Sequence, residues 1–453
     1  MECMKLRASS IVALLIGFTM LAVAGPSVYP TGTTLYNPAK AFNTFVLITG
    51  GDGSAHLIDM NGNSIHEWKN AGDLTTYIDP GLIGGKQGHV LVTLSTVEGQ
   101  GTDLVPGAVT TRITKTIGEI DFDGRTVWTF GDKMPDGLAR QHHDWARLPN
   151  GSTLVLSNLV HPVKGFKLPR QLDDVVYEVD PKGEVVWSWV ASDHLDEFGF
   201  TAEQLQLVRT ADTGDYLHLN NMKPVGPNHW FAQADARFAP DNILIDSRNA
   251  NFIAIIDRKT GKVVWRLGPN YPMANTPPTS RKVPRPLDRT SGQHDAQIIP
   301  EGLPGAGNLL VFDNEGEAGY PPVPVTLTGG SRVLEIDPVK QQIVWQYTGQ
   351  DSGEPDWSFR STHISSARRL PNGNTLICEG QPGRVFQVTR DGEIVWEYVN
   401  PYPRQSKDPN NGRIVANYQL YRAQAVQYDW VPAGTPHSER AVTPSNKTQF
   451  RIR

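Results

Sequence analysis

The segment Glu178-Val179-Asp180-Pro181-Lys182-Gly183-Glu184-Val185-Val186-Trp187 decides the fold of this chain. A first strand ends at Asp180, whose side chain can cap the turn that follows. Gly183 supplies the backbone freedom that this turn needs. The second strand ends in a large aromatic side chain. The segment therefore predicts a β-hairpin whose tryptophan packs between neighbouring sheets.

The same hairpin recurs six times along the 453 residues. Its copies end at Trp68, Trp128, Trp187, Trp265, Trp345 and Trp396. The last copy carries Thr389 and Arg390 where the others carry an aspartate. A bulky aromatic at one register of six repeats is typical of a radial array of sheets and not of a sandwich.

A second repeated signature precedes most of the hairpins. Residues 147–156 and 369–377 are near copies, in which a strand ends, turns at Pro-Asn-Gly and continues as a second apolar strand. Together with the tryptophan hairpin, this gives four strands in each repeat. The sequence therefore predicts an all-β fold, a six-bladed β-propeller with four-stranded blades.

The two ends of the repeat array are incomplete in complementary ways. The N-terminal repeat lacks an inner strand before Thr44, and the segment 421–426 has no outer strands after it. We expect the C-terminal strand to join the N-terminal blade and close the ring, which leaves no open sheet edge. The predicted blades are 75–130, 140–189, 215–267, 292–347 and 360–398, with 420–427 completing 44–68. Segments 190–214, 224–238 and 269–290 are predicted insertions that cap one face.

The N-terminus has the pattern of an export signal. Lys5 and Arg7 precede an apolar stretch from Ile11 to Val23, and Ala22-Val23-Ala24 has the form of a cleavage site. We expect a signal peptide at 1–24, an N-terminal extension at 25–43, the propeller at 44–432 and a poorly ordered tail at 433–453. The mature protein is then periplasmic or secreted, with no membrane span. An uncleaved membrane anchor is the alternative.

Charge and cysteine content narrow the possibilities further. The formal charge of -5 and the absence of a basic run argue against nucleic-acid binding. Cys3 leaves with the signal, so Cys378 cannot form an internal disulfide, and its apolar surroundings predict a buried, inert thiol.

Three histidines share one position in the repeats. His143, His218 and His294 each stand six residues before a proline, at the start of a predicted innermost strand. Such side chains converge near the centre of a propeller. Histidine can act as a nucleophile or as a general acid and base near neutral pH. Three histidines can also bind zinc, but no short ligand spacing such as His-x-x-x-His supports a metal site.

Other polar side chains are predicted at the same mouth. They are Tyr77, His142, Asn220, Arg248, Thr362, His363 and Tyr421. The set is cationic and rich in donors, which suits a tetrahedral anion such as phosphate or sulfate. The segment 313–317 faintly resembles a calcium loop but lacks its spacing, and we expect a solvated loop there. Neither a metal nor a diffusible cofactor is expected.

The ordered set of motifs resembles the bacterial aryl sulfotransferases that use aryl sulfates as donors in place of a nucleotide sulfate. It comprises His142-His143-Asp144, Asp215-Tyr216-Leu217-His218-Leu219-Asn220, Ser247-Arg248, Gln293-His294, Asp313-Asn314 and Tyr421-Arg422-Ala423. The resemblance implies a periplasmic six-bladed propeller in which His294 accepts the sulfuryl group covalently. It further implies that His143 and His218 contact the sulfate or assist proton transfer, and that Asn220 and Arg248 bind the anion.

The chain departs from that family pattern in several places. Larger members carry an N-terminal β domain for dimerisation, for which 25–43 leaves no room, so the oligomeric state stays open. A disulfide of some members is impossible here, and about a dozen extra residues separate His218 from Arg248. The family's threonine in the fifth blade matches Thr362, but His363 stands beside it.

Three functions compete at this point. The first is sulfuryl transfer from an aryl sulfate to a phenol through a sulfohistidine. The second is a non-catalytic propeller that binds a ligand or partner. The third is a quinoprotein-like dehydrogenase, which predicts eight tryptophan blades, an adjacent cysteine pair and a calcium site, and the sequence shows none of these.

Overall fold

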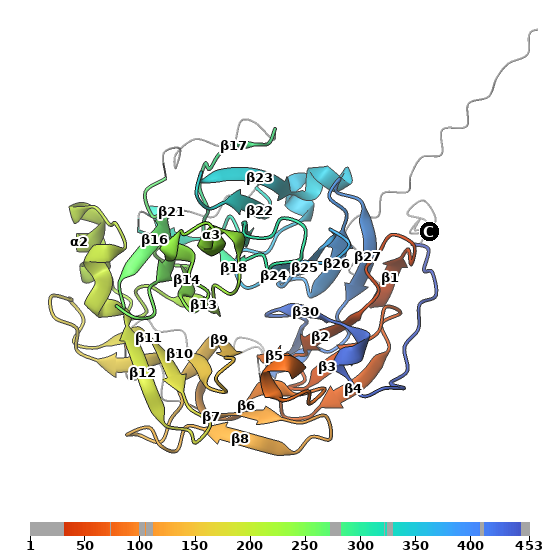
Figure 1. Ribbon diagram of the computed structural model, residues 1–453, viewed down its shortest axis with the longest axis horizontal. Coiled ribbons are helices and arrows are strands. Elements are labelled where there is room, and N and C mark those ends of the chain that lie inside the picture. The colour runs from red at the N-terminus through yellow and green to blue at the C-terminus, as the bar shows by residue number, and fades with distance from the viewer. Residues whose placement is uncertain are drawn as a thin grey trace, which may run out of the picture.

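The computed structural model describes residues 31–72, 74–98, 105, 112–271, 282–320, 322–323, 329–407 and 412–444. The described chain forms six four-stranded blades arranged as a ring (Figure 1). This confirms the predicted six-bladed β-propeller. The predicted signal peptide at 1–24 lies outside the described residues.

Each blade is an antiparallel sheet, and its innermost strand lies nearest the centre of the ring (Figure 1). Blade 1 comprises β30 (Ala423–Val426), β2 (Phe45–Thr49), β3 (Ala55–Ile58) and β4 (Ser64–Trp68). Blade 2 comprises β5 (Thr75–Tyr77), β6 (Val90–Glu98), β7 (Arg112–Ile120) and β8 (Thr126–Phe130). Blade 3 comprises β9 (Gln141–Arg147), β10 (Thr153–His161), β11 (Gln171–Val179) and β12 (Val185–Val190).

The second half of the ring repeats this plan with small additions. Blade 4 comprises β13 (Leu219–Pro224), β14 (Ile243–Ser247), β15 (Phe252–Ile256) and β16 (Val263–Leu267). Blade 5 comprises β18 (His294–Ile298), β19 (Leu309–Asp313), β22 (Arg332–Asp337) and β23 (Gln342–Tyr347), with β17 (Arg285–Pro286) outside them. Blade 6 comprises β24 (Ser366–Arg369), β25 (Thr375–Glu379), β26 (Arg384–Val388) and β27 (Ile394–Val399), with β1 (Gly32–Tyr36) outside them. Two short hairpins, β20–β21 (Ala318–Gly319, Pro322–Val323) and β28–β29 (Arg404–Lys407, Ile414–Asn417), stand apart from the blades.

Segments from both ends of the chain contribute strands. β30 pairs with β2 in the register Phe45↔Val426 to Ile48↔Ala423, which is the strand pairing expected from the sequence. β1 belongs to the segment expected to be an extension, and it adds a fifth strand to blade 6. The expectation of a poorly ordered tail does not hold for 433–444, because Val442 forms a β-bridge with Tyr36.

The repeated tryptophans join neighbouring blades. Indole nitrogens donate to backbone oxygens in the hairpin turn of the next blade, in the pairs Trp68–Asp121, Trp189–Gly261, Trp265–Pro338, Trp345–Arg390 and Trp396–Met60. In blade 3 this bond comes from Trp189, two residues beyond the repeat position. Trp187 instead packs under the guanidinium of Arg258, 3.7 Å from its ring centre. Each such bond satisfies a buried donor and sets the spacing between two sheets.

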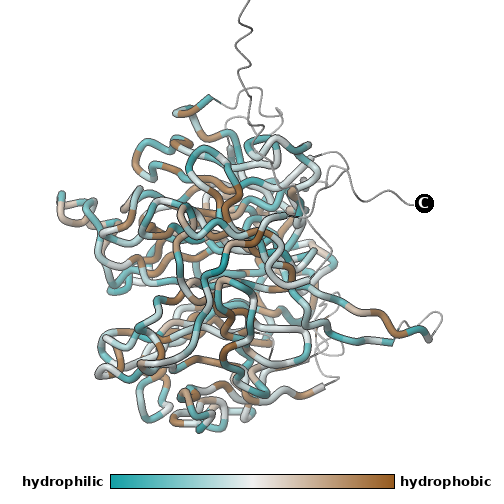
Figure 2. Tube along the Cα trace, turned by 90° about the vertical axis from the view of Figure 1, so that its right-hand side faces the viewer, coloured by the Kyte–Doolittle hydropathy of each residue, from teal (hydrophilic) through white to brown (hydrophobic). Residues whose placement is uncertain are grey.

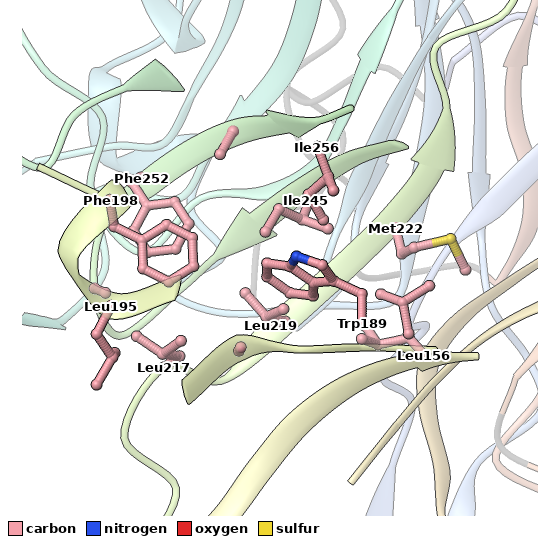
Figure 3. Close-up of a cluster of buried hydrophobic side chains, with 14 of the residues drawn as sticks. Leu156, Trp189, Leu195, Phe198, Leu217, Leu219, Met222, Ile245, Phe252 and Ile256 are labelled. Atoms are coloured by element: carbon pink, nitrogen blue, oxygen red, sulfur yellow. The ribbon is translucent and has the colours of Figure 1, made fainter. Parts of the chain in front are cut away.

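Apolar side chains fill the spaces between the blades. Between blades 3 and 4, Trp189, Leu156 and Met222 pack with Leu219, Ile245 and Ile256, and Phe198 stacks on Phe252 (Figure 3). Figure 2 shows apolar segments running mainly through the body and polar segments at the outer turns. Burial of this kind is the main favourable term in folding. Cys378 is fully buried in a similar cluster, as predicted.

Two of the predicted insertions form short helices. Segment 190–214 contains η2 (Ala191–Glu197) and α2 (Ala202–Thr210), and 224–238 contains α3 (His229–Ala232) and η3 (Ala236–Phe238). α2 lies on the outside of the ring, and α3 lies over the blades near β14 and β18 (Figure 1). α2 begins with a capping box between Thr201 and Gln204, which satisfies its first backbone N–H groups. Among the described residues, no helix is both long and apolar enough to cross a membrane.

Candidate functional site

The three predicted histidines meet at one end of the innermost strands. The ring of His143 lies 4.7 Å from that of His218 and 5.5 Å from that of Tyr421, measured between ring centres. His294 is buried and lies close enough to both histidines and to Arg248 for their charges to affect it. Side chains far apart in the sequence thus form one site, as the shared register predicted.

The backbone at this end departs from regular strand geometry. His143 and His218 have φ values of 56° and 52°, in a region that side chains other than glycine rarely adopt. The register of β9, β13 and β18 against their neighbours shifts at Val155/Ser157, Leu219/Asn221 and His294/Gln297. Such bulges redirect side chains next to functional sites.

His294 is held in a single tautomer. Its Nδ1 lies 2.8 Å from Oδ1 of Asn314 and 3.0 Å from the carbonyl oxygen of Gly292. Both partners only accept, so Nδ1 carries the proton. The backbone N–H of Ile364 donates to Nε2 over 3.1 Å. His294 therefore presents a lone pair on Nε2. Burial lowers the pKa of His294 well below its usual value, and Arg248 adds to this effect, so the ring is neutral.

The orientation of the Asn314 amide is fixed by its other bonds. Its Nδ2 donates to the carbonyl oxygens of Ser361 and Ile364, over 2.5 and 2.9 Å. The expectation of a solvated loop at 313–317 is wrong, because Asp313 and Asn314 are buried. Asp313 accepts from the backbone of Ser291, and that bond ties the loop to the segment preceding His294. The sequence placed Asp313-Asn314 among the motifs of the resemblance but gave them no role, because the composition of the loop resembles a polar turn.

His143 and His218 differ in charge preference. Burial lowers the pKa of His143 well below its usual value, and the neighbouring His218 and His142 lower it further. His218 is also buried, but its Nδ1 lies 2.6 Å from Oδ2 of Asp215, and this carboxylate outweighs burial and raises the pKa of His218. The site thus pairs a neutral histidine with one that favours its protonated form. Asp215 stands three residues before His218, a spacing that could have revealed it.

Arg248 lies directly beside His218. Its backbone N–H donates to the carbonyl oxygen of His218 over 3.1 Å, as a continuation of the β13–β14 pairing. The extra residues between them therefore do not separate the two side chains. Arg248 also lines an open pocket of ≈ 550 Å³ with Thr213, Glu317 and Tyr320. A guanidinium in that place can bind an anion entering the site.

The sequence did not decide which residue of two neighbouring pairs faces the site: His142 or His143, and Thr362 or His363. His143 is the member of the first pair that faces His218 and Tyr421, while His142 lies behind it with its Nδ1 2.7 Å from Nδ1 of His143. In the second pair, the hydroxyl of Thr362 bonds to Gln381. The half-buried His363 lies near Arg248 and His218, and burial and these charges lower its pKa.

Asn220 and Tyr421 support the site from below. The Nδ2 of Asn220 donates to the carbonyl oxygen of Gln293, which leaves one hydrogen of that amide for another acceptor. The hydroxyl of Tyr421 donates to the carbonyl oxygen of Asn220 over 2.8 Å. Both side chains therefore fix the backbone beside His218 and His294.

Tyr77 does not join this cluster. It lines a different pocket, of ≈ 230 Å³, together with Gln297, Pro300 and Leu370, which lie at the opposite end of the innermost strands. β5, the innermost strand of blade 2, has only three residues and ends at Tyr77. The residue that reaches the histidine end of this blade must therefore come before β5. The repeat position of Tyr77 was therefore assigned to the wrong end of its strand.

A buried charge network forms the floor of the site, and sequence reasoning missed it. It joins Asp144, Lys223, Asp295, Arg368 and Arg422, which come from or adjoin the innermost strands of five blades. Asp295 pairs with both arginines, so it does not orient His294, in agreement with the sequence argument. Burial, opposed in part by Asp144, lowers the pKa of Lys223 to about 8. No motif spacing could reveal a network whose members lie on different blades.

The nitrogens of the site histidines face neighbouring protein groups. Within the part of the chain that the structure describes, no group of three or more His, Cys, Asp or Glu side chains is placed to hold a metal ion. His294 faces Asn314, His218 faces Asp215 and His142 faces Asp174. The backbone N–H of Ile364 donates to Nε2 of His294.

Comparisons with known proteins identify the family. Residues 36–394 match the sequence profile of the family described as Arylsulfotransferase (ASST). A search of curated proteins finds no match. Among solved structures, a protein of unknown function from Bacteroides caccae is 13% identical, over 85% of this chain and 99% of that one, with a TM-score of 0.45. A periplasmic gluconolactonase from Pseudomonas aeruginosa is 12% identical, over 89% and 100% of the two chains, with a TM-score of 0.39.

The fold and the site define a six-bladed propeller with a histidine-lined, cationic site at one end of its innermost strands. The chain belongs to the arylsulfotransferase family, whose profile covers most of its length. Membership supports aryl sulfotransferase activity in general, with aryl sulfates and phenols as substrates.

Proposed function

We propose that the protein moves a sulfuryl group from an aryl sulfate to a phenol through a covalent sulfohistidine at His294, in a ping-pong sequence. The observation that carries this proposal is the fixed tautomer of His294, which places the lone pair of a neutral ring on Nε2, near Arg248. The N–H of Ile364 bonds to this lone pair, so this N–H must turn to a sulfuryl oxygen when sulfur approaches Nε2. A neutral imidazole is a competent nucleophile at sulfur, and the leaving phenolate can depart before the acceptor arrives.

Each half-reaction needs one proton transfer. In the first, Nε2 of His294 bonds to sulfur, the sulfur–oxygen bond to the donor phenol breaks, and His218 protonates the leaving oxygen. In the second, the acceptor phenol loses its proton to a neutral histidine, its oxygen bonds to sulfur, and the electron pair of the S–N bond returns to His294. The raised pKa of His218 and the lowered pKa of His143 suit these two roles.

Charge on the sulfuryl oxygens is matched by fixed donors. Arg248 is available at the mouth, and the N–H of Ile364, which now bonds to Nε2, lies within reach of an oxygen on a sulfur bound there. Ile364 and Ser365 have φ values of 55° and 92°. This strained backbone costs free energy and is typical of residues held for function. Preorganised donors of this kind stabilise developing charge.

Steady-state kinetics with a chromogenic aryl sulfate and a phenol test the proposal. We expect parallel double-reciprocal lines when donor concentration is varied at several acceptor concentrations. Intersecting lines together with full activity in His294→Ala would exclude the covalent route. Absence of any transfer with a broad set of aryl sulfates would favour the ligand-binding propeller.

The cellular location belongs to the same proposal. The N-terminal pattern favours export, so we propose that the reaction takes place in the periplasm or outside the cell. Fractionation of cells expressing the full chain, with a variant lacking residues 2–24 as control, tests this location. Equal distribution of both proteins would contradict it.

A further inference from the structure

Two adjacent aspartates on β11 each contact a histidine. Asp173 and Asp174 are both fully buried. Oδ2 of Asp173 lies 2.8 Å from Nε2 of His161, and Oδ1 of Asp174 lies 3.2 Å from Nε2 of His142. Neighbouring residues of a strand point to opposite faces, so the two pairs lead in different directions. His161 is 40% exposed, whereas His142 leads to His143.

The contacts around Asp174 favour one arrangement of protons on the two histidines. Asn158 donates to its Oδ1 and the backbone N–H of Leu219 donates to its Oδ2. Nε2 of His142 makes no hydrogen bond of regular geometry, but it lies 3.2 Å from Oδ1 of Asp174, and a carboxylate at that distance favours a proton on this nitrogen. In the tautomer with its proton on Nε2, His142 has its lone pair on Nδ1, 2.7 Å from Nδ1 of His143. In that arrangement Nδ1 of His143 donates across this distance, and the lone pair of His143 is on Nε2.

The surroundings of His143 disfavour a second positive charge at this place. His218, His142, His294 and Arg422 all face it. Asp174, by contrast, is faced by His142 and by Asp215. A proton taken up by His143 is therefore stabilised when the positive charge moves toward the carboxylate.

We propose that Asp174 and His142 are positioning residues that hold Nε2 of His143 as a base and carry away the proton of the acceptor phenol. The inference rests on the proposed function and deepens its second half-reaction. As the phenol oxygen bonds to sulfur and the S–Nε2 bond of His294 breaks, the phenol proton moves to Nε2 of His143. The Nδ1 proton of His143 moves to His142, and the Nε2 proton of His142 moves to Asp174.

The number of protons bound by the enzyme is the same before and after one full catalytic cycle. His218 gives one proton to the first phenol, and the relay takes one proton from the second. The rings of His143 and His218 lie 4.7 Å apart, between centres, so reversal of the relay returns the proton to His218. No oxidant, reductant or co-reactant is required.

Single-turnover kinetics of Asp174→Asn and His142→Gln test the relay. Enzyme sulfated by a chromogenic aryl sulfate is mixed with phenols of graded acidity. We expect the rate of transfer to weakly acidic phenols to fall about 10- to 100-fold more than the rate of the donor burst. Loss of the carboxylate partner of a metal-bound histidine has an effect of this size. Strongly acidic phenols, already ionised, should be affected far less. The solvent proton inventory of the acceptor step should be curved in the unaltered enzyme, because several protons move, and linear in both variants.

His161→Gln is the matched control, because it removes the histidine of the adjacent pair. It should leave both half-reactions unchanged. The same loss for all phenols, or no loss in either variant, would overturn the relay while a normal burst upholds the proposed function. Absence of a burst in the unaltered enzyme would instead overturn the proposed function itself. Melting temperatures of both variants identify a misfolded one, and the relay is then judged on the other.

Discussion

The two ends of the innermost strands have different designs. At the Pro-Asn-Gly end, regular turns repeat from blade to blade, with Leu148 bonding to Ser152 and Leu370 to Asn374 through their backbones. At the histidine end, the strands shift register and His143, His218, Asp295 and Ile364 have positive φ. The repeated turns and strands form the blades, and the register shifts and positive φ values at the histidine end position the site residues.

Residues at the two ends should therefore differ in how their substitution affects stability and activity. Turn residues at the regular end make few side-chain bonds, such as those of Asn372 to Asn374 and Lys40, so single changes there should cost little and leave activity intact. Residues at the histidine end hold strained backbone and buried charge, which are tolerated where function requires them.

Removal of residues from Gln419 onward should have the largest effect, because it deletes β30, the innermost strand of blade 1. The edge of β2 is then exposed and Tyr421 and Arg422 are lost, so we expect loss of cooperative unfolding and aggregation. Circular dichroism and light scattering measure both. The control ends after Pro432 and keeps β30 and Trp430. Equal melting temperatures for the two truncations would show that β30 does not close the ring.

Arg248→Ala should lower turnover ~100- to 1,000-fold, the usual cost of removing one donor from developing charge. The fold should remain, since Arg248 is only half-buried and bonds to Asn249 through its side chain. Arg237→Ala, on the surface and paired with Asp235, is the control and should change nothing. Unchanged turnover and unchanged donor affinity in Arg248→Ala would place the sulfuryl group elsewhere.

Asp215→Asn should shift the alkaline limb of the pH profile of kcat/KM for the donor to lower pH. Asp215 raises the pKa of His218, and the protonated form of His218 is needed in the free enzyme, so activity falls as pH rises through that pKa. Without the carboxylate this fall begins at lower pH. The acidic limb, set by the neutral His294 that attacks the donor, should stay well below pH 6.5, the ordinary histidine value. An alkaline limb at the same pH in both proteins would contradict the assignment.

Asn372→Ala at the regular end should have the smallest effect. It removes the bond from the backbone N–H of Asn374 to Oδ1 of Asn372 and the exposed bond from Nδ2 of Asn372 to the carbonyl oxygen of Lys40, each at a cost of about 0.5–1.5 kcal/mol in the free energy of unfolding. Urea denaturation measures this cost, and turnover should remain that of the unaltered enzyme. A drop in turnover comparable with that of Arg248→Ala would show that the two ends are coupled.

The sequence predicted the blades and the three histidines better than it predicted the residues that hold those histidines in place. Blade number, strand count and the convergence of His143, His218 and His294 followed from a repeat, because a repeated register fixes a repeated place in space. The partner Asn314, the relay from Asp174 and the floor around Arg422 did not, because each joins residues on different strands or blades. Tyr77 failed for a related reason, since its short strand breaks the register used to place it.

The central claim is that His294 carries the sulfuryl group, and mass spectrometry of enzyme treated with donor alone tests it most directly. The account predicts release of one equivalent of phenol and a gain of ~80 Da on the peptide containing His294, discharged when a phenol is added. His294→Ala should show neither. Phenol release and transfer without any added mass on that peptide, or with full activity in His294→Ala, would contradict the account.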